Sequence, residues 1–246
     1  MPEGQRRRAS RARTVSDALQ HRQHPRPHLG VWAARLGEAP AGRVLRLEAG
    51  PRDWHPFIHM PAGLGRLVNQ RRINWDYYTE PEPRLHGRRL WWPRGKVLGG
   101  CSSINAMCYT RGVPGDYDAW ARAGADGWHW EAVLPWFLRA EGNTRGAGPL
   151  HGADGPLCVS DLRHRNRLSE AFVEAGVQAG WPRNDDFNGP TQEGFGFYQV
   201  TQRDGARCSA AAAYLAPARR RPNLEVVTGA LVLRIVVEGG RARGVE

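Results

Sequence analysis

The fold of this chain is decided by the stretch Arg94-Gly95-Lys96-Val97-Leu98-Gly99-Gly100-Cys101-Ser102-Ser103-Ile104-Asn105-Ala106-Met107-Cys108-Tyr109. Its paired glycines, Gly99 and Gly100, leave a turn without Cβ atoms, so the backbone is free to approach a ligand closely and to adopt positive φ without strain. We interpret the stretch as a cradle for a cofactor. A plain turn before a helix has the same pattern, and both interpretations stand at this point.

The residues after the glycines predict a helix. Ser102 or Ser103 is a good N-cap, and Ile104, Met107 and Cys108 then recur at helical spacing. The free N–H groups at such a helix start, together with the positive end of its dipole, favour a phosphate or a reduced, negatively charged ring.

The composition narrows the class of protein. A chain of 246 residues can bury a large core in one or two domains, and no apolar run is long enough to span a bilayer. The four cysteines show neither metal-ligand spacing nor a disulfide framework, so we expect a reducing compartment, the cytoplasm. Two of them, Cys101 and Cys108, are expected to share a helix face as small packing residues.

The positive charge is distributed unevenly. The formal net charge is +11, and Lys96 is the only lysine, so the other 34 basic residues are arginines. Most are scattered rather than gathered in one stripe with stacking aromatic residues, but residues 1–30 carry seven arginines against Glu3 and Asp17. An Arg-rich nucleic-acid-binding protein with a disordered basic arm is therefore the alternative function class.

Residues 1–29 are predicted to be disordered, because the apolar residues there are few and follow no helix or strand period. The segment has three interpretations: a transit or twin-arginine signal, a nucleic-acid arm, or sequence foreign to the fold. A secretory signal requires an apolar stretch after Arg6-Arg7-Arg8, and none follows.

The chain from Leu29 onward has the pattern of a dinucleotide-binding unit. Residues 31–36 predict a short helix, and residues 43–47 predict a strand that ends in Glu48-Ala49-Gly50. In a βαβ unit an acid at this place bonds the ribose hydroxyls, about 20 residues after a glycine-rich turn. That turn is expected near residues 25–33, where only Gly30 is present.

Together these stretches resemble the amino-terminal half of the glucose–methanol–choline (GMC) family of flavin oxidoreductases, and most closely its choline-dehydrogenase-like members, from about Val31 to Glu246. The matching stretches, in chain order, are Val44-Leu45-Arg46-Leu47-Glu48-Ala49-Gly50, Asn74-Trp75-Asp76-Tyr77, Thr79-Glu80-Pro81-Glu82-Pro83, the cradle, Tyr109, Arg111-Gly112, Asp116-Tyr117-Asp118-Ala119-Trp120, His151-Gly152, Gly155-Pro156-Leu157, Asp185-Asp186-Phe187-Asn188-Gly189, Gln192-Glu193-Gly194-Phe195-Gly196, Arg207-Cys208-Ser209-Ala210-Ala211, Ala213-Tyr214-Leu215 and Arg221-Pro222-Asn223-Leu224.

The resemblance implies an α/β fold: an incomplete FAD-binding Rossmann-like domain with part of an antiparallel-sheet substrate domain. Residues 30–160 would form the first part of the FAD domain, with the flavin cradle at 94–109. Residues 161–222 would form a connecting and substrate-side segment, and residues 223–246 would return to the FAD domain, truncated.

The resemblance also implies roles for single residues. Glu48 would hold the adenosine ribose of FAD, and Val232 would touch the adenine through its backbone. Val97, Gly99 and Gly100 would lie along the pyrophosphate and the flavin ring, and the isoalloxazine would be lined by Asn105, Ala106, Met107 and Cys108. Some family members bond the flavin covalently through a histidine where this chain has Ile104, so we expect dissociable FAD.

The activity that the resemblance implies is oxidation of the CH–OH group of a choline-like or aliphatic alcohol, with hydride transfer to flavin N5. The family's proton-abstracting histidine lies in a carboxyl-terminal part with no counterpart here, so we predict no catalytic residue. Loss of a general base costs a factor of roughly 10²–10⁴. We therefore expect an inactive fragment with weak FAD binding, whose two ends arise from a frameshift and early termination. The resemblance does not identify the electron acceptor. It implies a small-molecule alcohol as the substrate and no nucleic-acid partner for the protein.

The rest of the chain is predicted to be mostly structural. An aromatic-rich packing patch is expected around a helix that begins near Trp130, and a helix over 168–179 is expected to turn Phe172, Val173 and Val177 inward before Gly180. We expect a turn rather than a calcium loop at 185–188, and a strand over 193–199. His55 and His59 are not expected to bind a metal, because Pro56 lies between them.

The end of the chain predicts three strands. Residues 224–228 and 231–238 have apolar or alternating patterns, and Gly239-Gly240 is a tight turn into residues 242–246.

Overall fold

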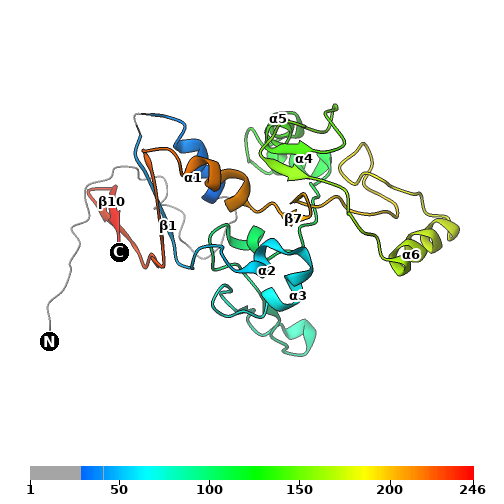
Figure 1. Cartoon of the computed structure of the whole chain (residues 1–246), viewed down its shortest axis with the longest axis horizontal. Coiled ribbons are helices and arrows are strands. Elements are labelled where there is room, and N and C mark those ends of the chain that lie inside the picture. Colours follow the sequence, from blue (N-terminus) through cyan, green and yellow to red (C-terminus); the bar gives the residue numbers. More distant parts are fainter. Residues whose placement is uncertain (1–28, 41) are drawn as a thin grey trace.

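The computed structural model describes residues 29–40 and 42–246, and its elements are arranged as Figure 1 shows. The helices are α1 (Leu29–Leu36), α2 (Pro56–His59), η2 (Pro61–Gly63), α3 (Leu64–Leu67), η3 (Pro83–Leu85), η4 (Gly100–Ser103), α4 (Pro114–Arg122), α5 (Trp130–Ala140), α6 (Arg167–Gln178), the π-helix η5 (Ala211–Leu215) and α7 (Ala216–Ala218). The strands are β1 (Val44–Glu48), β2 (Tyr77–Tyr78), β3 (Trp91–Trp92), β4 (Glu141–Asn143), β5 (Leu157–Val159), β6 (Gln202–Arg203), β7 (Ala206–Arg207), β8 (Leu224–Thr228), β9 (Ile235–Glu238) and β10 (Arg241–Val245). The predicted disorder of the amino-terminal segment lies, up to residue 28, outside the described residues.

A parallel strand pair brings together two parts of the chain that are far apart in the sequence. β1 pairs with β8 from Val44 opposite Leu224 to Glu48 opposite Thr228. Figure 1 shows the blue β1 running beside the orange-red return of the chain. Since a parallel pair needs a crossover, everything between residues 48 and 224 lies in that connection. The predicted strands at 43–47 and 224–228 are confirmed.

The main core covers this strand pair with two short helices. Ala33 and Ala34 of α1 pack with Leu215 of η5 and with Val44 and Leu224 of the strands, and all five are buried. Small alanines on both helices allow the close approach. A Cβ on Gly30 would lie 3.3 Å from Leu215 Cγ, so Gly30 serves this helix packing.

A second core lies under the cradle. Ile58 of α2 and Leu67 of α3 are fully buried together with Val97, and Ile73 and Ile104 complete the cluster. Because Val97 and Ile104 belong to the cradle stretch, burial of these aliphatic side chains ties the cradle to α2 and α3.

The aromatic patch of α4 and α5 is more exposed than predicted. Trp120, Trp128 and Trp136 are 50, 52 and 65% exposed. The ring at the centre is Tyr117, which is 7% exposed and lies 5.4 Å from the Trp120 ring and 5.7 Å from the Phe137 ring. The outer tryptophans of the patch therefore face solvent, and Tyr117 is its buried ring.

Helix α6 forms as predicted, with Val173 buried and Val177 half-buried, but Phe172 lies outside the buried face. Asn166 caps it, Val173 is buried, and Gly180 at φ +94° follows its end. Phe172 is 67% exposed, so its predicted inward orientation is wrong. The reason is Gly176, whose Cβ, if present, would lie 2.4 Å from the Phe195 ring, because that ring occupies the inner face.

The predicted strand over 193–199 is also wrong: this segment makes only an isolated bridge between Arg183 and Phe195, and Val200 bridges to Cys108 and Ser160. The last predicted strand pair is confirmed as the antiparallel hairpin β9–β10, although β9 starts at Ile235 rather than at 231. The turn at 185–188 is confirmed, with Asn188 N donating to Asp186 Oδ1.

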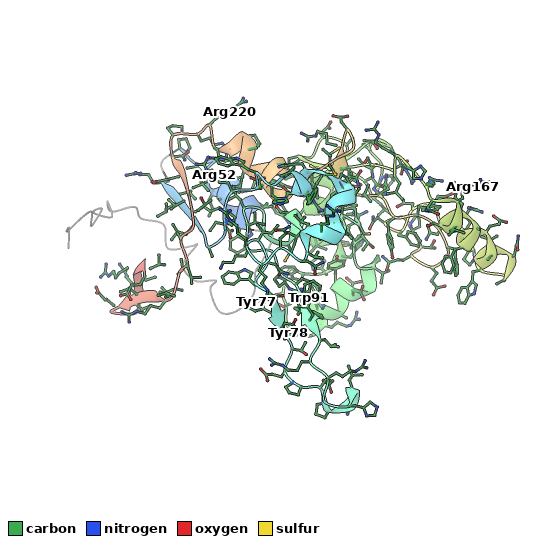
Figure 2. All side chains as sticks on the ribbon, turned by 60° about the horizontal axis from the view of Figure 1, so that its bottom comes forward. Arg52, Tyr77, Tyr78, Trp91, Arg167 and Arg220 are labelled. Atoms are coloured by element: carbon green, nitrogen blue, oxygen red, sulfur yellow. The ribbon has the colours of Figure 1, made fainter. Side chains whose placement is uncertain are left out.

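The short hairpin β2–β3 leads into a loop that projects from the body, as Figure 2 shows near Tyr77, Tyr78 and Trp91. These three aromatic side chains are all exposed. None of the helices in the described part of the chain has the length and apolarity that a bilayer crossing requires.

Candidate functional site

Three segments distant in the sequence meet at the carboxyl end of β1. Leu98 N of the cradle donates to Pro51 O at 3.0 Å. From the loop after β8, Gly229 N donates to Gly50 O at 3.0 Å and Ala230 N donates to Glu48 O at 2.9 Å. The end of a parallel strand, where ligands bind in open α/β sheets, is thus joined by backbone hydrogen bonds to the cradle and to the 229–230 loop.

The glycines of this junction are required by backbone contact. A Cβ on Gly50 would lie 1.9 Å from Lys96 O, and a Cβ on Gly95 would lie 2.2 Å from Gly100 O. Neither neighbour is a side chain that can move away. The start of the cradle therefore packs against its glycine pair and against the strand end.

The cradle glycines adopt the conformations that the sequence predicted. Gly99 has φ +91° and Gly100 has φ +57°, both in the left-handed region that favours glycine. A Cβ on Gly99 would lie 2.3 Å from Ser103 Oγ, so even alanine is excluded at this position on two grounds.

The predicted helix after the glycines is wrong, because the turn stops after η4 at Ser103. The serines do not act as N-caps: Ser102 Oγ donates to Gly99 O at 2.6 Å and Ser103 Oγ donates to Leu98 O at 2.8 Å. Both hydroxyls thus bond back into the cradle. Cys101 and Cys108 accordingly share no helix face.

Arg207 explains why no helix continues. Its Nη1 donates to Ser102 O at 3.1 Å and to Asn105 O at 2.7 Å, and its Nε donates to Ile58 O at 2.7 Å. A continuing helix would need the Ser102 carbonyl for its own i→i+4 bond. The guanidinium takes that carbonyl instead, and burial lowers the pKa of Arg207 to about 10, so it remains charged at neutral pH.

The sequence did not mark Arg207 as a site residue, although Arg207 lies in the family-like stretch Arg207-Cys208-Ser209-Ala210-Ala211. The available signal was a single arginine among small residues, from Ala206 to Ala213, in a segment otherwise suited to burial. A buried arginine in such a segment must find backbone carbonyls or a carboxylate.

Glu48 is held in place at the end of β1. Its Oε2 accepts from Arg46 Nη2 at 2.9 Å, and its Oε1 accepts from Gly50 N at 3.0 Å. Burial raises the pKa of Glu48, and the Gly50 N–H and the charges of Arg46 and Lys96 oppose that rise. The carboxylate is therefore oriented and only partly desolvated, with its side chain 11% exposed.

The residues predicted to line the flavin ring, 105–108, form the carboxyl-terminal edge of the cradle, and their side chains differ in exposure. Asn105, Ala106 and Cys108 are exposed, whereas Met107 is 5% exposed and has φ +63°. Met107 O accepts from Thr201 N at 2.8 Å, so this edge is fixed by residues far along the chain. Val232 is half-buried and follows the 229–230 loop that bonds to the end of β1.

A second polar cluster lies outside the cradle. His151 Nδ1 is 2.9 Å from Glu141 Oε1, and His151 Nε2 is 2.9 Å from Asp186 Oδ2. Glu141 is fully buried, and Asn143 Nδ2 also donates to its Oε1 at 2.8 Å. The cluster links β4 to the 184–189 turn, so we assign it a structural role.

The histidines considered as metal ligands have other contacts. His55 Nδ1 accepts from Phe57 N at 3.2 Å and caps α2, and His59 Nε2 lies 2.7 Å from Asp53 O. Within residues 29–40 and 42–246, no group of three or more His, Cys, Asp or Glu side chains is placed to hold a metal ion.

The strand end, the glycine cradle and the returning loop meet in one junction, and comparison with known proteins decides the family of the chain. A family model described as GMC oxidoreductase matches residues 17–246. The chain belongs to the GMC oxidoreductase family. The resemblance and the mixed α/β fold predicted from the sequence are confirmed.

Curated relatives resemble this GMC oxidoreductase chain over most of its length. An alcohol dehydrogenase (acceptor) from Pseudomonas putida is 49% identical over 217 residues, which are 88% of this chain and 39% of the relative. The mitochondrial choline dehydrogenase of Homo sapiens is 50% identical over 225 residues, covering 88% of this chain and 38% of the relative. The chain thus spans about two fifths of the length of these relatives.

Solved structures show the same fold. Pyridoxine 4-oxidase from Mesorbium loti matches with a TM-score of 0.82 and 38% identity, over 88% of this chain and 43% of the other. An FAD-dependent oxidoreductase from Chaetomium thermophilum matches with a TM-score of 0.80 and 29% identity, over 89% of this chain and 39% of the other.

Proposed function

We propose that this GMC chain binds FAD at the junction of the β1 end, the cradle and the 229–230 loop. The observation that carries the proposal is the backbone-to-backbone contact of Gly50 with Lys96 and of Gly95 with Gly100, which leaves no room for side chains. These glycines let three backbone segments converge at the carboxyl end of a parallel strand, the place where open α/β sheets bind ligands. The FAD-dependent structural neighbour supports it.

The residues that would hold FAD are those the resemblance implied. Glu48 would accept hydrogen bonds from the ribose hydroxyls, with its carboxylate oriented by Arg46 and Gly50 N. Val97, Gly99 and Gly100 would lie along the pyrophosphate and ring, and Val232 would lie at the adenine. The edge at 105–108 would face the isoalloxazine, with Arg207 holding its backbone in place.

We further propose non-covalent FAD. The position that carries a flavin-linking histidine in some family members is Ile104, which has no nucleophilic atom and is 4% exposed in the core under the cradle. An aliphatic side chain packed in a core cannot form the covalent link.

The activity proposed for the protein that contains this chain is oxidation of the CH–OH group of an alcohol, in the cytoplasm. When bound, FAD supplies the hydride acceptor for this chemistry. The relatives named as alcohol and choline dehydrogenases support a choline-like or aliphatic alcohol as the substrate. The nucleic-acid alternative gains no support, because its basic arm lies almost wholly outside the described residues.

The test is retention of flavin by the purified chain. Gel filtration in buffer that contains FAD keeps weakly bound flavin in equilibrium with the protein, so we expect flavin absorbance above that of the buffer to travel with the protein, and acid precipitation of the protein to leave FAD in solution. Gly99→Ala should abolish retention, and Gly115→Ala is the matched control because no atom lies within 4 Å of its Cβ position. Circular dichroism confirms folding of both variants. Absence of flavin on the folded unmodified chain contradicts the proposal, and flavin in the precipitate contradicts non-covalent binding.

A further inference from the structure

A buried cation outside the cradle has no carboxylate partner in the described chain. Arg111 is 6% exposed, and no ion pair found within residues 29–40 and 42–246 includes it. Its Nη2 donates to Leu150 O at 2.7 Å and to Asn188 O at 3.0 Å. Its Nε and Nη1 are buried without a hydrogen-bond partner in the described part of the chain. A buried charge in this state is costly unless an anion compensates it.

This arginine lines a cavity of about 260 Å³. The other lining residues are largely apolar, and those that define its character are Val113, Trp130, Leu150, Phe187 and Gln192. The lining contains no aspartate or glutamate, so Arg111 supplies its only formal charge. An apolar cavity with one cation is complementary to a small molecule that has an apolar body and one anionic group.

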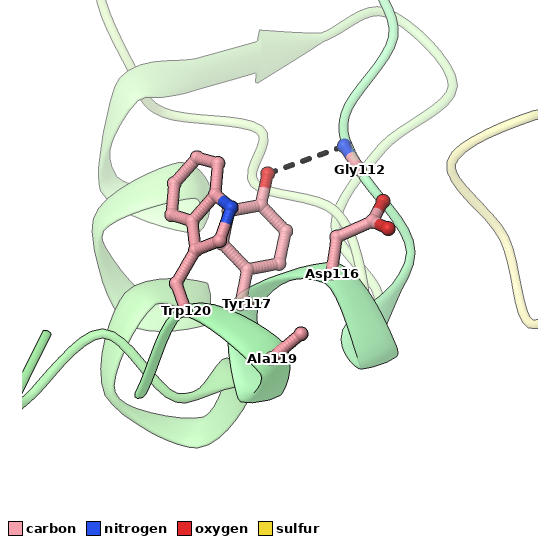
Figure 3. A pocket seen from close by; sticks show the side chains of 5 residues that line it. All are labelled: Gly112, Asp116, Tyr117, Ala119 and Trp120. Atoms are coloured by element: carbon pink, nitrogen blue, oxygen red, sulfur yellow. Dashed lines mark hydrogen bonds between the residues drawn. The ribbon is translucent and has the colours of Figure 1, made fainter. Parts of the chain in front are cut away.

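The neighbouring cavity differs in charge. It has a volume of about 310 Å³ and shares Gly112, but its other lining residues include Asp116, Tyr117 and Trp120 (Figure 3). Gly112 N donates to Tyr117 Oη at 3.2 Å, and Val113 N donates to Asp116 Oδ2 at 3.0 Å. The Asp116 carboxylate disfavours an anion in this second cavity, so the two cavities favour ligands of different charge.

The guanidinium is pre-organised for a planar oxyanion. Its Cζ lies 5.6 Å from the centroid of the Phe137 ring, which packs against the group and limits its motion. The carbonyl oxygens of Leu150 and Asn188, which accept from Nη2, fix the orientation of the guanidinium from another side. Arginine in a fixed orientation favours carboxylates, because two of its N–H groups match the two carboxylate oxygens.

We propose that the Arg111 cavity is a binding site for a small organic carboxylate with an apolar or aromatic body. The site is separate from the proposed FAD junction, and the proposal does not rest on FAD binding. Nε and Nη1 have no hydrogen-bond partner among the described residues, so a carboxylate seated in the cavity would compensate the buried charge.

The experiment uses the full chain in the absence of FAD. Benzoate and benzamide are titrated separately into the protein, and binding is measured by calorimetry and by ligand-observed NMR. The two probes have nearly the same shape, and only benzoate carries the charge. We expect saturable benzoate binding and binding of benzamide that is weaker by about tenfold or more, as loss of a charged hydrogen-bond pair implies. Equal affinities, or no saturable benzoate binding, overturn the proposal.

Variants locate the site. Val113 lines the cavity and is 38% exposed, so Val113→Phe reduces the space of the cavity and leaves Arg111 in the chain, and Val113→Ala is its matched control. We expect benzoate binding to weaken in Val113→Phe and to persist in Val113→Ala. Arg111→Gln should abolish the preference for benzoate over benzamide, but it also removes the bonds to Leu150 and Asn188, so the Val113 pair decides. Unchanged benzoate affinity in Val113→Phe contradicts this location.

Discussion

Glu48 shows at the residue scale how one carboxylate combines burial with orientation. It accepts hydrogen bonds from Arg46 and from Gly50 N, yet burial is the largest influence on its pKa, which is raised above the ordinary value of 4.5. The folded chain therefore keeps the Glu48 proton at a pH where the unfolded chain has lost it. The contribution of Glu48 to stability is greatest below pH 4.5 and falls as the pH rises through the folded-state pKa.

The raised pKa of Glu48 leads to a prediction for Glu48→Gln, which keeps the shape of the side chain and removes its titratable proton. Relative to the unmodified chain, the variant should gain stability as the pH rises above the unfolded-state value of 4.5. The measurement is the difference in Tm between the two FAD-free proteins across a pH series. Parallel Tm curves would show that Glu48 titrates alike in both states.

At the scale of elements, Asn223 connects the turn after α1 to the start of β8. Its Nδ2 donates to Gly37 O at 3.2 Å, to Ala39 O at 3.0 Å and to Gly42 O at 2.9 Å. The adjacent carbonyl, Asn223 O, accepts from Val44 N at 2.8 Å. One amide side chain thus sets how β1 enters the sheet beside β8.

We predict that Asn223→Asp destabilises the fold by about 3 kcal/mol, because a carboxylate would face three carbonyl oxygens with no hydrogen to donate. The matched control is Asn69→Asp, where one exposed Nδ2 donates to Gly65 O at 2.9 Å. Its effect should remain below about 1 kcal/mol. Urea unfolding of both variants measures the difference, and equal losses would contradict the role assigned to Asn223.

At the scale of the whole molecule, buried apolar contacts are distributed unevenly. β1 and β8 lie in the main core with Val44 and Leu224 buried, whereas no residue of the β9–β10 hairpin is buried. Figure 1 shows the hairpin lying beyond the β1–β8 pair, away from the helices. Local stability follows the density of buried apolar contacts, so these two strand pairs should open independently.

Hydrogen exchange measures this difference. We predict that amides paired between β9 and β10 exchange faster than those paired between β1 and β8 by about tenfold or more, because opening the hairpin exposes little apolar surface. The comparison is internal, since both pairs belong to one chain in one sample. Equal protection would mean that the hairpin opens only with the core.

Sequence patterns located most elements and the glycine cradle. The helix at α1, the strands at β1 and β8, the helices at α5 and α6, and the positive φ of Gly99 and Gly100 follow from local preferences. Apolar periodicity and the absence of a Cβ act within a few residues, and for this reason the sequence alone determined them. The family was recognisable for the same reason, since its motifs are short and contiguous.

Tertiary structure decided what depends on distant partners. The cradle is not followed by a helix because Arg207, 105 residues after Ser102, takes the Ser102 carbonyl. Phe172 lies outside the buried face because the Phe195 ring fills the space against Gly176, and in the α4–α5 patch Tyr117 is buried whereas the outer tryptophans are exposed. Hydrogen-bond competition and covering of a face involve residues far apart in the chain, so no local pattern carries that information.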